Sequence, residues 1–332
     1  MKPLTKKTGE KLECLLCPHH CKLASGKTGI CGVRKNTGEK IELTTYGVIS
    51  GYSLDPVEKK PLYHFFPGHN ILSIGSYGCN MRCDFCQNFH ISQNIPESQF
   101  PGVTIKKIIK DALSAEKNIG VAFTYNEPII SIEFIRDVSV VAKKEDLFTV
   151  MVSNGYVNSE PLDEILEFID AFNIDLKAFN NDFYRKLAGA ELEPVKNSLK
   201  QIASSGKHLE ITTLVIPGQN DDEKEMLRQS EWMAGELGRD IPFHLSRYYP
   251  TYKRDDPPPS EESMKRLFEI ASGYMDYVYL GNNNTANQNT LCPGCGTLVT
   301  IRTGYKTKLV NLDEEGSCVN CGSQVYRNFS FS

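Results

Sequence analysis

The residues of this chain best suited to chemistry are its eleven cysteines, which fall into three groups of four, three and four. The middle group is Cys79, Cys83 and Cys86, and it follows closely on a short apolar run. Three thiolates this close together on a loop can ligate three corners of a cubane iron–sulfur cluster and leave its fourth iron open. An open position is typical of a catalytic metal site. A zinc site completed by His90, or three unrelated thiols, is the alternative interpretation.

The last group consists of two Cys-x2-Cys-Gly pairs separated by 22 residues. This pattern predicts a zinc ribbon, whose strands would be formed by the residues between the two pairs. Four thiolates close the coordination shell, so we expect a structural zinc, with a rubredoxin-like iron as the alternative. The predicted ligands are Cys292, Cys295, Cys318 and Cys321.

The first group lies near the N-terminus and has wider, less regular spacing. Its members are Cys14, Cys17, Cys21 and Cys31. These four residues could hold zinc or an additional iron–sulfur cluster, and His19 and His20 add two further candidate ligands. A second cluster near the first could relay electrons, whereas zinc would be structural. Both interpretations remain open at the level of the sequence.

Composition places the chain among ordinary globular proteins. Of its 332 residues 40% are hydrophobic and 23% are charged, with 37 basic against 41 acidic side chains. Disordered, collagen-like and membrane-spanning classes are excluded, and the near-neutral charge argues against nucleic acid as the main partner. The first ten residues lack the apolar stretch of a secretory signal. Clustered thiols without such a signal predict metal ligands in a reducing compartment, by default the cytoplasm.

Short apolar runs alternate with helical patterns between residues 70 and 281. The runs cover 71–76, 119–124, 147–153, 171–176, 209–216, 241–246 and 277–281. The helical patterns cover 105–113, 129–144, 160–169, 194–205, 222–237 and 260–272. This repetition predicts an α/β fold with a parallel sheet and crossover helices, most simply a partial (β/α)6-type, TIM-like barrel. We expect a Cys-rich N-terminal segment at 1–69, the barrel at 70–285 and a zinc-ribbon-like module at 286–332.

The segment CNMRCDFC at 79–86 resembles the CxxxCxxC signature of radical S-adenosylmethionine (SAM) enzymes, including the aromatic residue before the last cysteine, here Phe85. The resemblance implies that the three cysteines hold a [4Fe-4S] cluster whose open iron chelates SAM. It also implies one-electron cleavage of SAM to methionine and a 5′-deoxyadenosyl radical, which abstracts hydrogen from a substrate. In that superfamily the cysteine loop follows the first strand of a partial barrel, and active sites of such barrels lie at the carboxyl ends of the strands.

Polar residues indeed follow the predicted strands. Glu127 matches the acid with which the resembling family binds the SAM amino group, although it could be a plain loop carboxylate. Ser153 and Asn154 can hydrogen-bond ribose hydroxyls or the methionine carboxylate, or simply form a turn. Asp175 and Lys177 share one face of their strand, and the similar Asp-x-Lys of activase-like families contacts SAM. An ordinary ion pair at the barrel rim is the alternative for this pair.

One further strand offers a histidine. By the same alternation His244 shares a face with Ser246, so we expect His244 either to contact SAM or substrate or to be a structural histidine.

Over nearly its whole length the chain resembles the AmmeMemoRadiSam system radical SAM enzymes, which are related to pyruvate formate-lyase activating enzymes. The resemblance rests on the segments 14–34 and 46–68, the cysteine loop, TYNEP at 124–128 and the terminal ribbon. In this comparison Lys59, Lys60, Tyr63 and His64 are candidates for the substrate side of the barrel, with turn and packing roles as alternatives.

We therefore predict a cytoplasmic radical SAM oxidoreductase that uses a [4Fe-4S] cluster and SAM and also holds zinc. Its substrate is an unidentified small molecule or protein, and its electrons would come from a donor such as flavodoxin or ferredoxin. No nucleic acid or membrane partner is expected. The first alternative is a glycyl-radical enzyme activase that acts on a protein glycine loop. The second is a non-catalytic metal-binding interaction protein.

Overall fold

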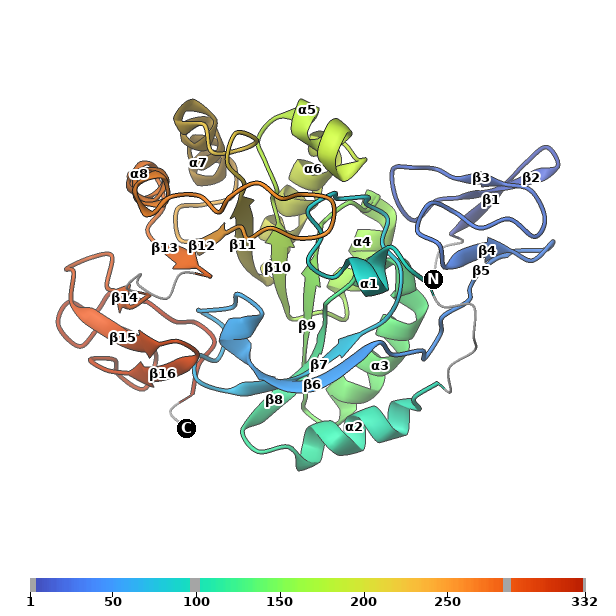
Figure 1. The fold of residues 1–332 in the computed structure, drawn as a ribbon. Helices are drawn as coiled ribbons and strands as arrows, with labels where there is room; N and C mark the ends of the chain where they lie inside the picture. The colour runs from blue at the N-terminus through green and yellow to red at the C-terminus, as the bar shows by residue number, and fades with distance from the viewer. Residues whose placement is uncertain (1–3, 96–101, 283–287, 331–332) are drawn as a thin grey trace.

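The computed structural model describes residues 4–95, 102–282 and 288–330, and its centre is an eight-stranded sheet (Figure 1). The strand order is β13-β12-β11-β10-β9-β8-β7-β6. Strands β7 to β13 run parallel, and β6 runs antiparallel to β7. The strands are β6 (Gly51–Pro56), β7 (Asn70–Gly75), β8 (Asn118–Phe123), β9 (Phe148–Ser153), β10 (Ala171–Asp175), β11 (His208–Val215), β12 (Phe243–Arg247) and β13 (Val278–Gly281). Within the described residues β6 and β13 form the two edges of the sheet, so the barrel is partial.

The longer helices between the parallel strands cover the outer face of the curved sheet (Figure 1). They are α2 (Ile105–Ser114), α3 (Ile132–Lys144), α4 (Ser159–Leu166), α6 (Leu192–Ser204), α7 (Glu223–Glu236) and α8 (Glu261–Ser272). Polar caps define where they begin: the side chain of Thr104 accepts from the N–H of Lys107 at the start of α2. The apolar runs and helical patterns of the sequence coincide with β7–β13 and these helices, so the predicted parallel sheet with crossover helices is confirmed.

Strand β6 and helix α5 (Asn181–Phe183) are among the elements that have no counterpart among the sequence predictions. Strand β6 lies inside the segment assigned to the N-terminal part and pairs along its whole length with β7, from Gly51 opposite Gly75 to Pro56 opposite Asn70. The short helix α5 continues as a π-helical turn over Tyr184–Ala188 and ends at Gly189 in the left-handed conformation. Both elements help to build the site described below.

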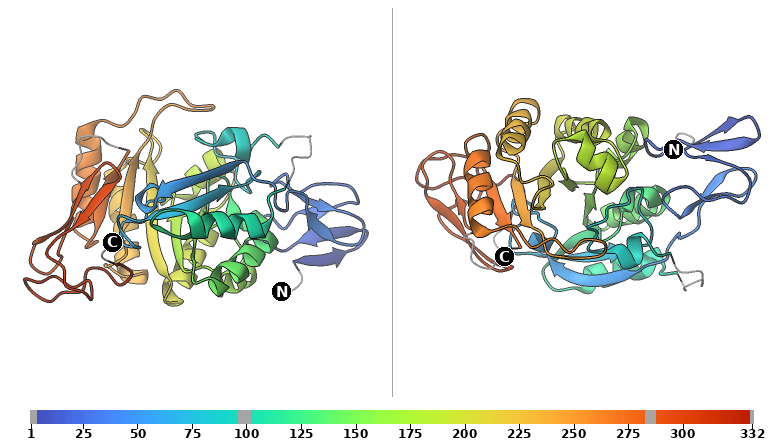
Figure 2. Two further views of the ribbon diagram at one scale, coloured as in Figure 1. Left: turned by 90° about the horizontal axis from the view of Figure 1, so that it is seen from below. Right: turned by 45° about the horizontal axis from the view of Figure 1, so that its top comes forward.

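A small module of short strands forms one end of the molecule (Figures 1 and 2). It contains the antiparallel sheet β1 (Thr5–Thr8), β2 (Lys11–Cys14) and β3 (Lys22–Leu23), and the hairpin β4 (Arg34–Asn36) and β5 (Ile41–Leu43). We refer to residues 4–45 as the N-terminal module. The first group of cysteines belongs to it.

Residues 288–330 form a second module, the C-terminal module, at the opposite end (Figure 2). Its sheet consists of β14 (Thr290–Leu291), β15 (Leu298–Thr303) and β16 (Lys306–Leu309). A shared apolar cluster joins it to Tyr279 on β13 and to Tyr63, which follows β6. Nη2 of Arg302 donates to the carbonyl of Tyr63 at 2.8 Å, and the hydroxyls of Tyr279 and Thr290 lie 2.8 Å apart. The module therefore lies across the gap between the two edges of the sheet.

In the described part of the chain, every helix is too short or too polar to cross a membrane.

Candidate functional site

A cavity of about 330 Å³ opens at the carboxyl ends of the parallel strands. The structure brings nine sequence-predicted site residues together in its wall: Cys79, Phe85, Cys83, Cys86, Glu127, Ser153, Asn154, Asp175 and Lys177. They come from the loop after β7 and from the ends of β8, β9 and β10. Carboxyl ends of neighbouring parallel strands meet at one edge of a sheet, which explains why residues far apart in sequence line the same space.

The three thiols of the cysteine loop are spread apart around this space. Among residues 4–95, 102–282 and 288–330, the structure places only the C-terminal cysteines in a group of three or more ligand atoms within 4.8 Å of one another. Tetrahedral zinc with bonds of about 2.3 Å needs its sulfur ligands about 3.8 Å apart. The sulfurs of Cys79, Cys83 and Cys86 are not gathered as one zinc ion requires, whereas a polynuclear cluster binds each cysteine through a different iron and does not require it. Burial raises the pKa of the Cys83 thiol to about 12.

Glu127 is buried and joins the ends of two strands. Its carboxylate accepts hydrogen bonds from Ser153 Oγ at 2.7 Å, from the N–H of Asn154 at 2.8 Å and from the N–H of Ile129 at 3.0 Å. Burial raises the pKa of Glu127 to about 7, against the opposing effect of these three donors. The side chain is thus a carboxyl group that is fixed in the cavity wall and whose pKa lies near neutral pH.

Asn154 connects Glu127 with the cysteine loop. Its Nδ2 donates to Asn80 Oδ1 at 2.9 Å and lies 3.6 Å from Cys79 Sγ, while its Oδ1 accepts from the N–H of Tyr156 at 2.9 Å. The backbone N–H of Met81 also points to Cys79 Sγ, at 3.3 Å. These donors would stabilise negative charge on the sulfur of Cys79.

Asp175 and Lys177 form an ion pair that faces the cavity, as the alternation along β10 predicts. Lys177 Nζ lies 2.9 Å from Asp175 Oδ2. Burial opposes the charge on Lys177, but Asp175 and the nearby Cys83 sulfur outweigh it and raise the pKa of the ammonium group. The N–H of Lys177 donates to the hydroxyl of Tyr184 in the π-helical turn, at 3.1 Å. The pair places one cation and one anion beside the thiols.

Lys59, Lys60 and Tyr125 also line the cavity, and all three are held by Asp55, which sequence analysis missed. Asp55 on β6 accepts from Lys60 Nζ at 2.7 Å, Lys59 Nζ at 2.8 Å and the hydroxyl of Tyr125 at 2.5 Å. Tyr125 adopts a φ of 74°, and its ring packs against Gly75, where a Cβ would lie 2.8 Å from the ring. The short interval between Asp55 and the two lysines was the available signal, but it becomes meaningful only once β6 pairs with β7.

Of the four residues proposed for the substrate side, Lys59 and Lys60 line the cavity. The lining does not include Tyr63 or His64. The backbone N–H of Tyr63 donates to Glu210 at 2.9 Å and that of His64 at 2.7 Å, and Glu210 itself does not line the cavity. The segment after β6 therefore turns away from the cavity between Pro61 and Tyr63.

His244 does not line the cavity either. Its Nε2 lies 2.6 Å from Glu210 Oε2, and His208 Nε2 lies 2.9 Å from the other oxygen. Burial opposes ionisation of Glu210, but these two histidines hold its pKa below the usual value. Ser246, on the same face of β12, does line the cavity. His244 thus shares the inward face, but it lies two residues deeper along the strand.

The segment between β12 and α8 passes over the cysteine loop (Figure 1). The N–H of Lys253 donates to the carbonyl of Asp84 at 3.0 Å, and Arg254 Nη1 lies 3.3 Å from the Asp84 carboxylate. The ring of Tyr252 stacks on Phe89 of helix α1 (Phe89–Ser92), with centroids 4.5 Å apart. This segment, residues 248–258, is called the strap below. It holds one side of the cavity mouth in place.

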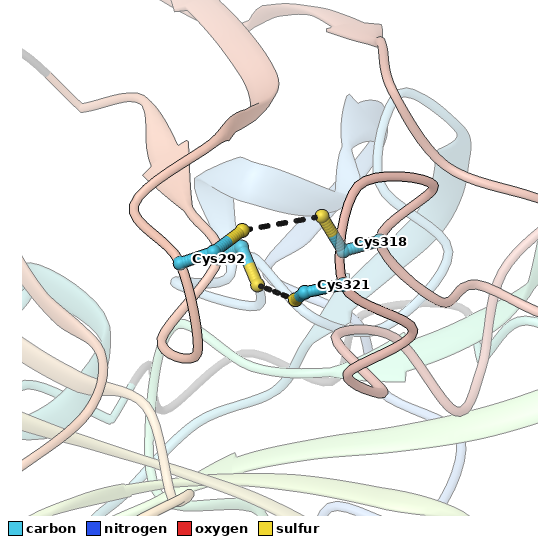
Figure 3. A group of neighbouring side chains, drawn as sticks. Cys292, Cys318 and Cys321 are labelled. Carbon is cyan, nitrogen blue, oxygen red and sulfur yellow. Dashed lines mark hydrogen bonds between the residues drawn. The ribbon is translucent and has the colours of Figure 1, made fainter.

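The four C-terminal cysteines converge in the way that a single metal ion requires (Figure 3). Cys292 Sγ lies 3.5 Å from Cys321 Sγ, and Cys295 Sγ lies 3.7 Å from Cys318 Sγ. Side-chain contacts from Asn320 and Thr297 lower the pKa of the Cys295 thiol to about 5, which favours the thiolate that binds metal. The separations match tetrahedral zinc. This site lies at the far end of the sheet from the N-terminal module.

Comparisons with known proteins agree with this geometry. A model of the radical SAM superfamily matches residues 73–229. An uncharacterised protein of Methanocaldococcus jannaschii is 39% identical over 321 residues, 95% of each chain. The pyruvate formate-lyase 1-activating enzyme of Escherichia coli is 29% identical over 220 residues, 59% of this chain and 86% of that enzyme. A solved radical SAM methyltransferase from Sphaerobacter thermophilus matches with a TM-score of 0.53 at 15% identity, over 70% of this chain and 71% of the other, and shows likeness of fold.

Proposed function

Because the chain belongs to the radical SAM superfamily, we propose that it binds a [4Fe-4S] cluster through Cys79, Cys83 and Cys86 and cleaves SAM reductively. Members of this superfamily are enzymes, and we assign this one to the oxidoreductases. When bound, the cluster and SAM would supply a one-electron cleavage that yields methionine and a 5′-deoxyadenosyl radical able to abstract hydrogen. The single observation that carries the proposal is that the three spread thiols share one cavity with Glu127, Asn154 and the Asp175–Lys177 pair.

The donor set of the cysteine loop fits such a cluster. Three sulfurs face one space, and they do not all lie within 4.8 Å of one another, as the ligands of a single zinc ion would. The N–H of Met81 and the amide of Asn154 approach Cys79 Sγ, and such donors adjust the electronic properties of a bound cluster. The chain's own contribution is to fix three ligands and leave one side of the space open to the cavity.

The remaining polar residues are suited to hold a zwitterionic amino acid moiety. The Glu127 carboxylate is held by three donors and can accept an ammonium group. Lys177 offers a cation for a carboxylate, and Asp175 keeps the lysine side chain extended toward the thiols. Ser153 and Asn154 position Glu127 and can donate to further oxygens. We propose these four residues, with Phe85, as the SAM-binding set.

The proposal is tested with protein purified and reconstituted under anaerobic conditions. Iron, sulfide and zinc are quantified, SAM and dithionite are added, and 5′-deoxyadenosine is measured. We expect deoxyadenosine from the wild-type chain and none from Cys83→Ala, which should keep the C-terminal zinc. Cleavage retained in Cys83→Ala would contradict the assignment. Zinc alone, without cleavage after reconstitution, would instead support a metal-binding interaction protein.

A second candidate function is favoured by the similarity to the pyruvate formate-lyase 1-activating enzyme. In that case the substrate would be a glycine in a protein loop, and the loop would have to pass the strap to reach the cavity. Peptides with α-deuterated glycine distinguish the two: deuterium in the deoxyadenosine supports the activase, and its absence supports a small substrate.

A further inference from the structure

The four N-terminal cysteines surround one small pocket. Cys14, Cys17 and Cys31 are buried, and Cys21 is half-buried. The remaining wall is largely apolar, with Leu16, Leu23, Ile30 and Ile130 among its residues. Four thiols that face an enclosed apolar space are arranged to hold something between them, because thiols that only pack in a core do not converge on a common pocket.

The separation of these sulfurs differs from that of the C-terminal group. In the part of the chain that the structure describes, no three of their Sγ atoms lie within 4.8 Å of one another. The neighbouring histidines do not complete a compact set either, since His19 Nε2 lies 2.7 Å from the carbonyl of Asn80 and His20 Nδ1 lies 3.1 Å from Glu13. One zinc ion would require contacts of about 3.8 Å, as found among Cys292, Cys295, Cys318 and Cys321. The cysteine loop likewise has no three sulfurs within that reach of one another.

A buried cation provides an independent observation. Arg34 lines the same pocket and is 2% exposed. Its two terminal nitrogens donate to Glu133, while Nε is buried without a hydrogen bond of ordinary length among the described residues, and the guanidinium lies beside the Cys14 thiol. A buried unpaired N–H is costly, so its position beside four thiols indicates an acceptor in the pocket. Sulfur atoms of an anionic metal cluster would be such acceptors.

We propose that Cys14, Cys17, Cys21 and Cys31 hold a second iron–sulfur cluster of the [4Fe-4S] type. All four irons then have a protein ligand, so this cluster is closed, whereas the one on the cysteine loop keeps an open iron. Arg34 offsets part of its negative charge and donates from Nε to a cluster or thiolate sulfur. This site does not depend on the proposed function.

The pocket of the four N-terminal cysteines lies directly against the cysteine loop. Gly78 adopts a φ of 88°, and a Cβ there would lie 2.5 Å from the carbonyl oxygen of Cys31. His19, two residues after Cys17, contacts the carbonyl of Asn80, which follows Cys79. The guanidinium of Arg82 also donates to the carbonyl of Ile30. A path of covalent bonds and one hydrogen bond therefore leads from Cys17 to Cys79.

Given the proposed function, this path assigns the second cluster a role as an electron relay. One electron would pass from a reduced flavin or iron–sulfur protein to the second cluster, which is then reoxidised as the first cluster is reduced. The donor is oxidised by one electron, and no bond or proton changes in this step. This role rests on the proposed function, whereas the presence of the cluster does not.

Metal analysis of the full chain tests the site without any activity. We expect about eight irons and one zinc in the reconstituted wild type, and about four irons in the triple variant Cys79→Ala/Cys83→Ala/Cys86→Ala. The triple variant should also give the electron paramagnetic resonance signal of a reduced cluster. The proposal would be overturned if the triple variant bound no iron, or if the wild type contained four irons and two zincs. Because the triple variant cannot cleave SAM, this result is independent of the proposed function.

Cys21→Ala tests the relay, with Cys318→Ala as its matched control. Cys21→Ala should lose about half of the iron and keep the rate of SAM cleavage with dithionite. With reduced flavodoxin its rate of cleavage should fall at least about tenfold. Cys318→Ala should lose zinc but neither iron nor flavodoxin-driven cleavage. Equal loss with both reductants, or no loss with either, would overturn the relay. Iron retained in full by Cys21→Ala would overturn the ligand set.

Discussion

The carboxylate of Glu127 accepts the backbone N–H of Asn154 at 2.8 Å, which ties the end of β8 to the end of β9 within the cavity wall. Asn154 in turn donates to Asn80 on the cysteine loop at 2.9 Å. One buried carboxyl group therefore fixes three segments at once. Its protonation state has consequences for stability that can be measured.

We expect the stabilisation that comes from Glu127 to decrease as the pH rises. Burial raises its pKa to about 7 from the usual value of 4.5, so the folded chain binds the proton more tightly than the unfolded chain does. The contribution is complete below pH 4.5 and is lost as the pH rises through 7. The free energy of unfolding of the wild type relative to Glu127→Gln should fall by up to about 3 kcal/mol between pH 5 and 8. Urea denaturation of both proteins at each pH measures this, and a constant difference would contradict it.

Replacing Lys177 with methionine should impair SAM cleavage while leaving the iron content unchanged. The ammonium group is the cation of the cavity wall next to Asp175, and a lost charged hydrogen bond costs about 1.5–3 kcal/mol. We expect a decrease of about 10- to 100-fold in the rate of deoxyadenosine formation. Lys186→Ala is the control, because Lys186 is exposed and pairs only with Asp182 on the same helical segment. Unchanged cleavage in Lys177→Met would remove the lysine from the binding set.

Asp55→Asn should destabilise the fold more than any change at its exposed partner. Asp55 is 4% exposed and pairs with Lys60, which is 2% exposed, so the substitution leaves a buried cation without its counter-ion. We expect a loss of about 3–5 kcal/mol in the free energy of unfolding. Lys59→Ala, at a side chain that is 45% exposed, should cost less than about 1 kcal/mol.

The contribution of Asp55 to stability depends on pH with the opposite sign to that of Glu127. Burial opposes ionisation of Asp55, but the two lysines and Tyr125 hold its pKa below the usual value. Its contribution is present above pH about 4 and is lost as the pH falls. Equal stability of Asp55→Asn and wild type at pH 7 would show that Lys60 is not held as a cation.

Cys318→Ala should release the C-terminal zinc and lower the melting temperature. Cys318 is buried in the cluster that joins the C-terminal module to Tyr63 and Tyr279, so loss of the metal also loosens that contact. We expect a decrease of at least about 5 °C by calorimetry, with the iron content unchanged. Val319→Ala is the control, since Val319 lies between the same ligands but is 62% exposed. A melting temperature that is the same with and without zinc would show that the metal does not support the contact.

The parallel strands could be predicted because they are buried on both faces. Runs such as FTVMVS in β9 and AFNID in β10 are nearly continuous apolar segments, which is typical of a parallel sheet. Strand β6 escaped prediction because GYSLDP has the polar and proline residues of a loop, and it becomes a strand only through its pairing with β7. Asp55 was missed with it. Local patterns do not contain that long-range pairing.

The residues of the candidate site also differ in how far the sequence could predict them. Residues at strand ends, such as Glu127 and Asp175, could be anticipated because carboxyl ends of parallel strands meet. His244 shows the limit of this reasoning, since alternation gives the face of a strand but not the depth along it. The sequence left the identity of the metal bound by the N-terminal cysteines undecided for another reason. Spacing along the chain does not determine how far apart sulfur atoms lie in space, and only the structure provides that separation.

The position of the C-terminal module also bears on how the protein is made. The module lies across the gap between β13 and the segment that contains Tyr63, and its residues leave the ribosome after all strands of the sheet. Synthesis proceeds at about 5–20 residues per second, and earlier parts fold first. Until residues 290–326 emerge, Tyr63, Tyr277 and Tyr279 lack their contacts with the C-terminal module. The gap between β6 and β13 is therefore covered only after all strands of the sheet have been translated.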